Sequence, residues 1–144
     1  MKLNGTHKFH APIQRVYNAL LSPDILKSVI PGCEQLAYID ANNMQAMVTT
    51  PLPGLKGPFA VTINIAQHQE PNLIALTVLR KGRGGAINAQ SQINLLEEAD
   101  GTLLSYNANA DLEGAISAAN NPIGQGIVKN SLGNLFKNLE KAIA

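Results

Sequence analysis

The sequence predicts an α+β fold: a seven-stranded curved antiparallel sheet, two short helices after the first strand, and a long C-terminal helix over a hydrophobic cavity. Three observations predict it. Two proline-initiated helical segments lie near the start, a period-two alternation of apolar and polar residues begins after residue 32, and an amphipathic stripe closes the chain. One helix is rarely wide enough to cover a curved sheet, so we expect a cavity between the two layers.

The first strand and the first helix follow from the opening residues. Apolar Leu3 and Phe9 alternate with polar residues, which is typical of a strand with one buried face. Pro12 suits the first position of a helix, because proline lacks the N–H that this position leaves unbonded. The apolar face of that helix consists of Ile13, Val16, Tyr17 and Leu20.

The second helix is short and ends in a stiff turn. Ser22 is a good N-cap and Pro23 a good first residue. Pro31 fixes its own φ and keeps the preceding residue out of the α region, while Gly32 permits the chain to reverse. The segment 30–34 therefore ends a helix, turns and opens a strand.

Six further strands are expected, at residues 33–40, 43–51, 57–68, 72–82, 85–97 and 102–113. Turn-forming residues such as Asp100 and Gly101 separate them. Short links of this kind join antiparallel neighbours, which leaves one face of the sheet wet and the other buried.

The last helix is predicted from an apolar stripe at three- and four-residue spacing, with lysine and asparagine on the other side. The stripe consists of Val128, Leu132, Leu135, Leu139 and Ala142. Residues 114–125 are rich in Ala, Ser and Asn, and we expect them to be less helical.

Composition restricts the class of protein. We expect a single domain over residues 1–144. Charged residues make up 15% of the chain and the net charge is +1, so nucleic-acid binding through phosphate neutralisation has little support. One cysteine rules out an internal disulfide. No apolar run approaches the length of about 18 residues that a membrane span needs, so we expect a cytoplasmic protein.

Several segments of the chain occur together in one known family. They are Met1-Lys2-Leu3-Asn4-Gly5, Ala11-Pro12 followed by Arg15 to Leu20, Ser22-Pro23 with Leu26, Ile30-Pro31-Gly32-Cys33-Glu34, Gly54 to Gly57 with Phe59, and Lys81-Gly82 followed by Gly84 to Ala86. In these segments the chain resembles the carbon monoxide dehydrogenase G-subunit family of the START-like (SRPBCC) helix-grip superfamily. The resemblance covers nearly the whole chain, and the segment 30–34 is its most specific element.

The resemblance implies a non-enzymatic accessory protein of a CO dehydrogenase-type molybdenum hydroxylase. These hydroxylases sit on the cytoplasmic face of the membrane, so a peripheral membrane contact is implied as well. The implied ligand is lipophilic, a quinone or a lipid, and would connect the enzyme's electrons to the respiratory pool. No tightly bound cofactor is expected.

We expect the ligand to lie between the inner face of the sheet and the last helix. The candidate ligand-binding residues are His7, Leu26, Val29, Ile30, Leu55, Phe59, Val61, Ile63, Leu76, Val78, Ile87, Tyr106, Ala108, Ile127, Val128, Leu132, Leu135 and Phe136. No residue is expected to be catalytic or to ligate a metal.

The polar members of this region have more than one interpretation. His7 is either a hydrogen-bond partner for a ligand carbonyl or a core histidine satisfied by backbone, and Tyr106 meets either a ligand oxygen or a backbone group. His10 falls on the other side of the strand and His68 is isolated, so the histidines are not expected to converge on a metal. Cys33 has no basic partner and is interpreted as structural.

The segment 80–85 holds the only concentration of basic residues, either a solvated hairpin tip or a contact with phospholipid headgroups. Three functions remain open. The chain is a binding module for a hydroxylase, a polyketide cyclase- or dehydratase-like enzyme using the same cavity, or a scaffold whose cavity is filled by its own side chains. Fold resemblance does not separate them.

Overall fold

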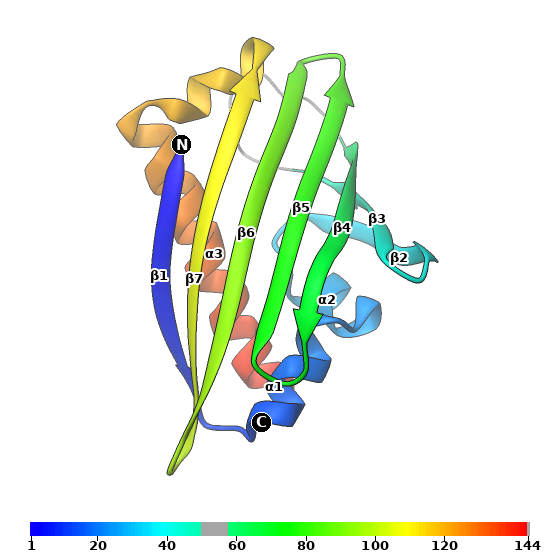
Figure 1. Ribbon diagram of the computed structural model, residues 1–144. Helices are drawn as coiled ribbons and strands as arrows, with labels where there is room; N and C mark the ends of the chain where they lie inside the picture. The colour runs from blue at the N-terminus through cyan, green and yellow to red at the C-terminus, as the bar shows by residue number, and fades with distance from the viewer. Residues whose placement is uncertain (50–57, 144) are drawn as a thin grey trace.

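The fold is the predicted α+β arrangement. Figure 1 shows the computed structural model, which describes residues 1–49 and 58–143. In chain order the elements are β1 (Lys2–Phe9), α1 (Ile13–Leu20), α2 (Pro23–Val29), β2 (Cys33–Asp40), β3 (Asn43–Val48), β4 (Phe59–Gln69), β5 (Leu73–Gly82), β6 (Gly85–Glu98), β7 (Gly101–Glu113), the 3₁₀ helix η1 (Gly114–Asn120) and α3 (Pro122–Ile143).

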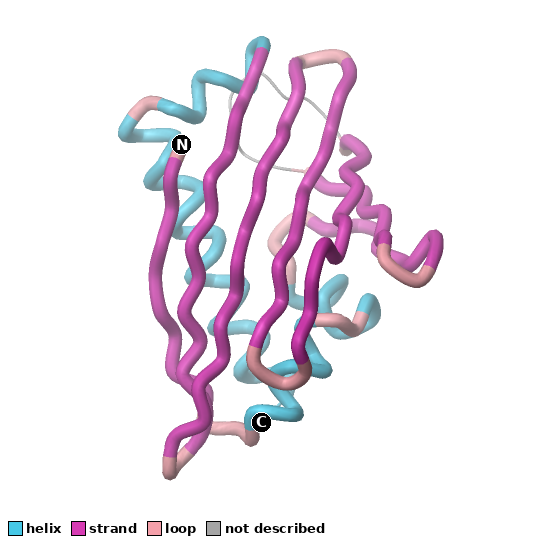
Figure 2. The backbone as a smooth tube through the Cα atoms, in the orientation of Figure 1, coloured by secondary structure: helices cyan, strands magenta, loops and turns pink. Residues whose placement is uncertain are grey.

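All strands join one seven-stranded antiparallel sheet in the order β1-β7-β6-β5-β4-β3-β2. The sheet is twisted and curved, and α3 crosses its inner face (Figure 2). Strands β1 and β2 form the two edges, and α1 and α2 carry the chain from one edge to the other. The predicted strands are confirmed, with ends that shift by a few residues; β3 ends at Val48.

The start of the last helix differs from the prediction. α3 begins at Pro122 and spans 22 residues, so the expected irregular stretch is helical from residue 122 onward. The side-chain oxygen of Asn121 accepts the N–H of Gly124 at 2.7 Å, which is an N-cap bond. This cap and the proline after it set the start of the helix, whereas the apolar stripe begins a turn and a half later.

The turn between α2 and β2 explains the glycine in it. Gly32 has φ of +78°, and a Cβ there would lie 1.9 Å from the backbone oxygen of Thr49. The N–H of Thr49 donates to the Gly32 oxygen at 2.8 Å. Only glycine tolerates both the conformation and this close approach, so the turn holds α2 against the end of β3.

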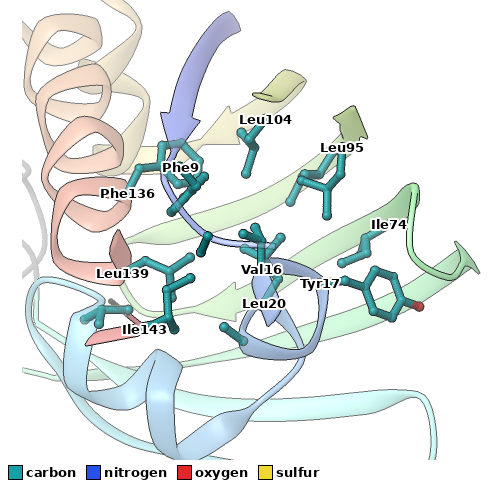
Figure 3. Packing of buried hydrophobic residues seen from close by; sticks show 14 residues of the cluster. Phe9, Val16, Tyr17, Leu20, Ile74, Leu95, Leu104, Phe136, Leu139 and Ile143 are labelled. Atoms are coloured by element: carbon teal, nitrogen blue, oxygen red, sulfur yellow. The ribbon is translucent and has the colours of Figure 1, made fainter. Parts of the chain in front are cut away.

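The main core lies at one end of the sheet, where α1 and the C-terminal half of α3 meet the inner face (Figure 3). Phe9, Leu104 and Leu139 are fully buried there. A second buried cluster lies under α2 and comprises Leu26, Leu36, Met44, Ala46, Val61 and Ile65.

Candidate functional site

The inner face of the sheet is apolar along its length, but the size of its side chains changes. Directly opposed residues of neighbouring strands share a face. Toward the main core, Leu104 pairs with Leu95. Further along, Ala108 pairs with Ser91 and Ala110 with Ala89. The inner face therefore has a band of small residues between the core and the large Ile87–Leu112 pair, and we call the core region the closed end and the region from this band onward the open end.

The predicted strand residues share this inner face, as their pairing shows. They are Phe59, Val61, Ile63, Leu76, Val78, Ile87, Tyr106 and Ala108. Tyr106 contacts α3, since its ring centroid lies 5.5 Å from that of Phe136. Sequence alternation thus identified the correct face of every one of these strands.

Helix α3 covers the two ends unequally. Phe136, Leu139 and Ile143 are buried at the closed end. The N-terminal half of α3 leaves Ile127 and Val128 half-buried and outside both buried clusters, whereas Leu132 and Leu135 near its middle are half-buried against the main core. Among the described residues, Ile87 and Ala108 below them pack against neither buried cluster. Apolar atoms of both layers therefore stay accessible at the open end.

A groove of about 810 Å³ borders this half of α3. Its described lining consists of Ile30, Pro31, Gly32, Val48, Thr49, Ile127, Val128, Asn130, Ser131, Leu132, Asn134 and Leu135. Five of them are predicted ligand-binding residues, and none carries a charge. The lining is apolar with a few amide and hydroxyl groups, which suits a lipophilic ligand with a small polar part.

Other predicted residues have little surface left for a ligand. Leu26, Val29 and Val61 are buried in the two clusters, and Phe136 is buried at the closed end. Leu55 lies outside the described residues. Phe59, Ile63, Leu76 and Val78 are half-buried and pack against the second cluster; Ile30 packs there too and keeps surface toward the groove.

His7 is bonded to a side chain that the sequence did not indicate. Its Nε2 lies 3.0 Å from a carboxylate oxygen of Glu140 on α3, and Nδ1 of His10 lies 2.9 Å from the other oxygen. His10 was expected on the other side of the strand from His7, yet both contact Glu140, because β1 ends at Phe9 and His10 leaves the strand alternation. These contacts hold the pKa of Glu140 below its usual range, the His10 contact more than the His7 contact.

Tyr106 lies flat across a glycine. A Cβ at Gly5, its cross-strand partner, would lie 2.8 Å from the tyrosine hydroxyl, so only glycine leaves room for the ring. Burial raises the pKa of Tyr106. Among the described residues its hydroxyl has no hydrogen-bond partner. The ring thus closes the seam between β1 and α3, and the hydroxyl remains available.

Cys33 behaves as a structural residue. Its thiol donates to the backbone oxygen of Gln35 at 3.4 Å, and burial raises the pKa of the thiol. Burial, the largest effect on this pKa, disfavours the thiolate that a nucleophile needs. Within residues 1–49 and 58–143, no three histidine, cysteine or acidic side chains are grouped as metal ligands would be.

Two polar residues of this face were not among the predicted ligand contacts, although Arg80 was considered as part of the basic hairpin segment. Ser91 is a half-buried hydroxyl residue in the middle of the open end, and Arg80 is a cation at its rim. The alternation of inward and outward residues indicates both positions. Ser91 lies two residues from Ala89 and from Ile93, and Arg80 follows Val78 by two residues, so both side chains belong to the inward-facing set.

A two-layer structure with one long helix across the concave face of an antiparallel sheet defines the class of protein, the helix-grip fold. Solved structures of the same fold are similar to this chain. A conserved protein from Geobacillus kaustophilus is 26% identical with a TM-score of 0.91, and the match covers 99% of this chain and 95% of that one. A protein from Chromobacterium violaceum is 17% identical with a TM-score of 0.78, covering 99% and 96%. A Thermus thermophilus protein is 15% identical with a TM-score of 0.73, covering 99% and 97%.

The particular family follows from the sequence. Residues 5–144 match the family of the carbon monoxide dehydrogenase G-subunit (CoxG), and the chain belongs to that family. The resemblance stated from the sequence is thereby confirmed. A comparison with curated proteins finds no match. None of the helices in the described part of the chain combines the length and apolar character needed to span a bilayer.

Proposed function

We propose that this protein is a non-enzymatic accessory protein of a CO dehydrogenase-type molybdenum hydroxylase, and that it holds a lipophilic ligand, a quinone or a lipid, at the open end. Family membership supports the link to the hydroxylase. The ligand is proposed from two neighbouring features: the small, half-buried side chains on the inner face of the sheet, and a groove of about 810 Å³ between α3, the turn after α2 and the end of β3.

One observation carries the ligand proposal. The inner face changes from Leu104 and Leu95 at the closed end to Ala108 and Ser91 at the open end, while α3 continues above both. Leaving apolar surface accessible costs roughly 25 cal/mol per Å², so a ligand that covers this surface is stabilised by the hydrophobic effect. A scaffold with a filled interior would bury these residues.

The test is native mass spectrometry of protein purified from its own host, followed by organic extraction. We expect a co-purifying quinone or lipid. Protein that is consistently empty and binds no added quinone would contradict the proposal. Diphenylhexatriene, a lipophile without a polar end, gives an independent fluorescence titration of the same surface.

The partner needs a separate test. With membranes and the purified hydroxylase, addition of this protein should raise substrate-dependent reduction of quinone. An unchanged rate at saturating protein would remove the delivery role, even if the ligand is found.

A peripheral membrane contact is proposed from the end of the molecule where the groove opens. Lys81 and Arg83 are exposed at the β5–β6 hairpin, and the backbone of η1 bonds this hairpin through Ile116 and Gly84 at 3.1 Å. Ile123, at the start of α3 beyond η1, is 78% exposed. Co-sedimentation with vesicles containing phosphatidylglycerol should exceed that with neutral vesicles and fall in high salt; equal sedimentation with both excludes this contact.

A further inference from the structure

The rim of the open end carries a cation on an otherwise apolar face. Arg80 lies in register with inward-facing Val78 and opposite Ile87 of β6. Its side chain is half-buried, and its guanidinium carbon lies 5.4 Å from the centre of the Phe59 ring. This ring and the two aliphatic residues are all predicted ligand contacts. Arg80 therefore lies on the inner face beside residues predicted to contact the ligand, outside the described lining of the groove.

The guanidinium is held in a fixed position. Nη1 donates to the backbone oxygen of Gly85, and Nη2 donates to that of Arg83. An arginine has five N–H donors, so three remain after these two bonds. Among the described residues no carboxylate lies within ion-pair distance of Arg80, whereas Lys8 is paired with both Glu98 and Asp100.

We propose that Arg80 holds the acceptor oxygens at the polar end of the bound lipophile, whose apolar part then extends along the inner face toward Phe136. The inference rests on the proposed ligand site and adds the orientation of the ligand to it. Charge-assisted hydrogen bonds to a partly buried arginine are stronger than those between neutral groups. A guanidinium already fixed by the hairpin loses little side-chain entropy when it binds.

Two kinds of ligand share this chemistry. A quinone presents carbonyl oxygens, and a fatty acid presents a carboxylate that also gains Coulomb energy from the cation. Three probes separate them: diphenylhexatriene has no polar end, decylubiquinone has carbonyls, and palmitic acid has a carboxylate. The affinity of each is measured by fluorescence or calorimetric titration of the full chain.

Arg80→Gln is the test variant, and Lys2→Gln, which removes an exposed positive charge on the outer face of β1, is the control. We expect Arg80→Gln to weaken binding of decylubiquinone, palmitic acid or both at least about tenfold, as the loss of a charged hydrogen bond does. Diphenylhexatriene should bind within about twofold of the wild type, because it makes no such bond. The control should bind all three probes as the wild type does.

The outcomes separate the two proposals. Loss confined to palmitic acid identifies a carboxylate ligand, and loss confined to decylubiquinone identifies a carbonyl ligand. Equal changes for all three probes, or no change, overturn the role of Arg80 and leave the ligand site standing. A wild-type protein that binds none of them overturns both proposals. Should Arg80→Gln fail to fold, Arg80→Lys keeps the positive charge but loses the planar guanidinium. It should weaken the binding of decylubiquinone, palmitic acid or both relative to that of diphenylhexatriene, and unchanged affinities would overturn the proposed role of Arg80.

Discussion

The two halves of α3 lie over the same sheet and meet different surfaces. The C-terminal half packs Phe136 and Leu139 against large side chains of β1, β6 and β7 (Figure 3). The N-terminal half carries Ile127 and Val128, which remain half-buried and outside both buried clusters. The apolar side of the helix therefore continues past the main core, while the side chains of the sheet become smaller.

This difference assigns the two halves of α3 different proposed roles: the C-terminal half stabilises the fold, and the N-terminal half borders the proposed ligand site. Large residues at the closed end fill the space between the layers and fix the position of α3. Small residues at the open end, Ala89, Ser91 and Ala108, leave apolar surface uncovered. Interiors are normally packed as densely as organic crystals, so a stretch of small residues under a helix supports the proposal of a ligand there.

The largest expected effect is a difference in stability between matched truncations in the two halves. Leu139→Ala removes a fully buried side chain, and we expect a loss of about 3 kcal/mol in the free energy of unfolding. Ile127→Ala removes a half-buried side chain that lies outside both buried clusters, and we expect about 1 kcal/mol. Urea unfolding measures both. Equal losses would show that the open end is packed as tightly as the closed end, and the comparison would fail.

The sequence predicted the surfaces of this site better than its polar contacts. Alternation assigns faces, so inward residues such as Ile63 and Val78 could be placed from the sequence alone. The same rule places Arg80 on the inner face, but its position near a hairpin tip suggested a solvent-exposed side chain. The start of α3 was missed because the cap at Asn121 lies outside the apolar stripe.

The bond between His7 and Glu140 had no signal in the sequence at all. The two residues are 133 positions apart, and their contact depends on the angle at which α3 crosses β1. No periodicity within one element carries that angle. Likewise, local sequence patterns predict that a cavity exists but not where it lies. Its position depends on which residues of β6 and β7 lie opposite each other, and this register is not visible in the sequence.

The second prediction fills the open end. Ala108→Phe adds a ring to the inner face, and we expect the affinity for diphenylhexatriene to fall at least about tenfold, because the ring occupies apolar space. The free energy of unfolding should change by less than about 1 kcal/mol, since overpacking is costly only where space is already filled. Asn107→Phe, one residue away on the outer face, is the control and should leave binding unchanged. Lost stability with unchanged binding would mean that no space exists beneath α3.

The smallest expected effect concerns the clamp, our name for the contacts of Glu140 on α3 with His7 and His10 at the end of β1. The carboxylate of Glu140 accepts from His10 and His7, and these bonds lower its pKa from the ordinary value of 4.5. A lowered pKa in the folded state means that the ionised group stabilises the fold above pH 4.5, and that this contribution is lost as pH falls through the lowered value. Glu140→Gln should therefore cost about 1 kcal/mol or less at pH 7 and nothing once the carboxyl is protonated. Urea unfolding of both proteins from pH 7 to pH 3 measures the difference. A constant difference across this range would show that the clamp acts through packing, and ligand binding at the open end should be the same in both proteins at pH 7.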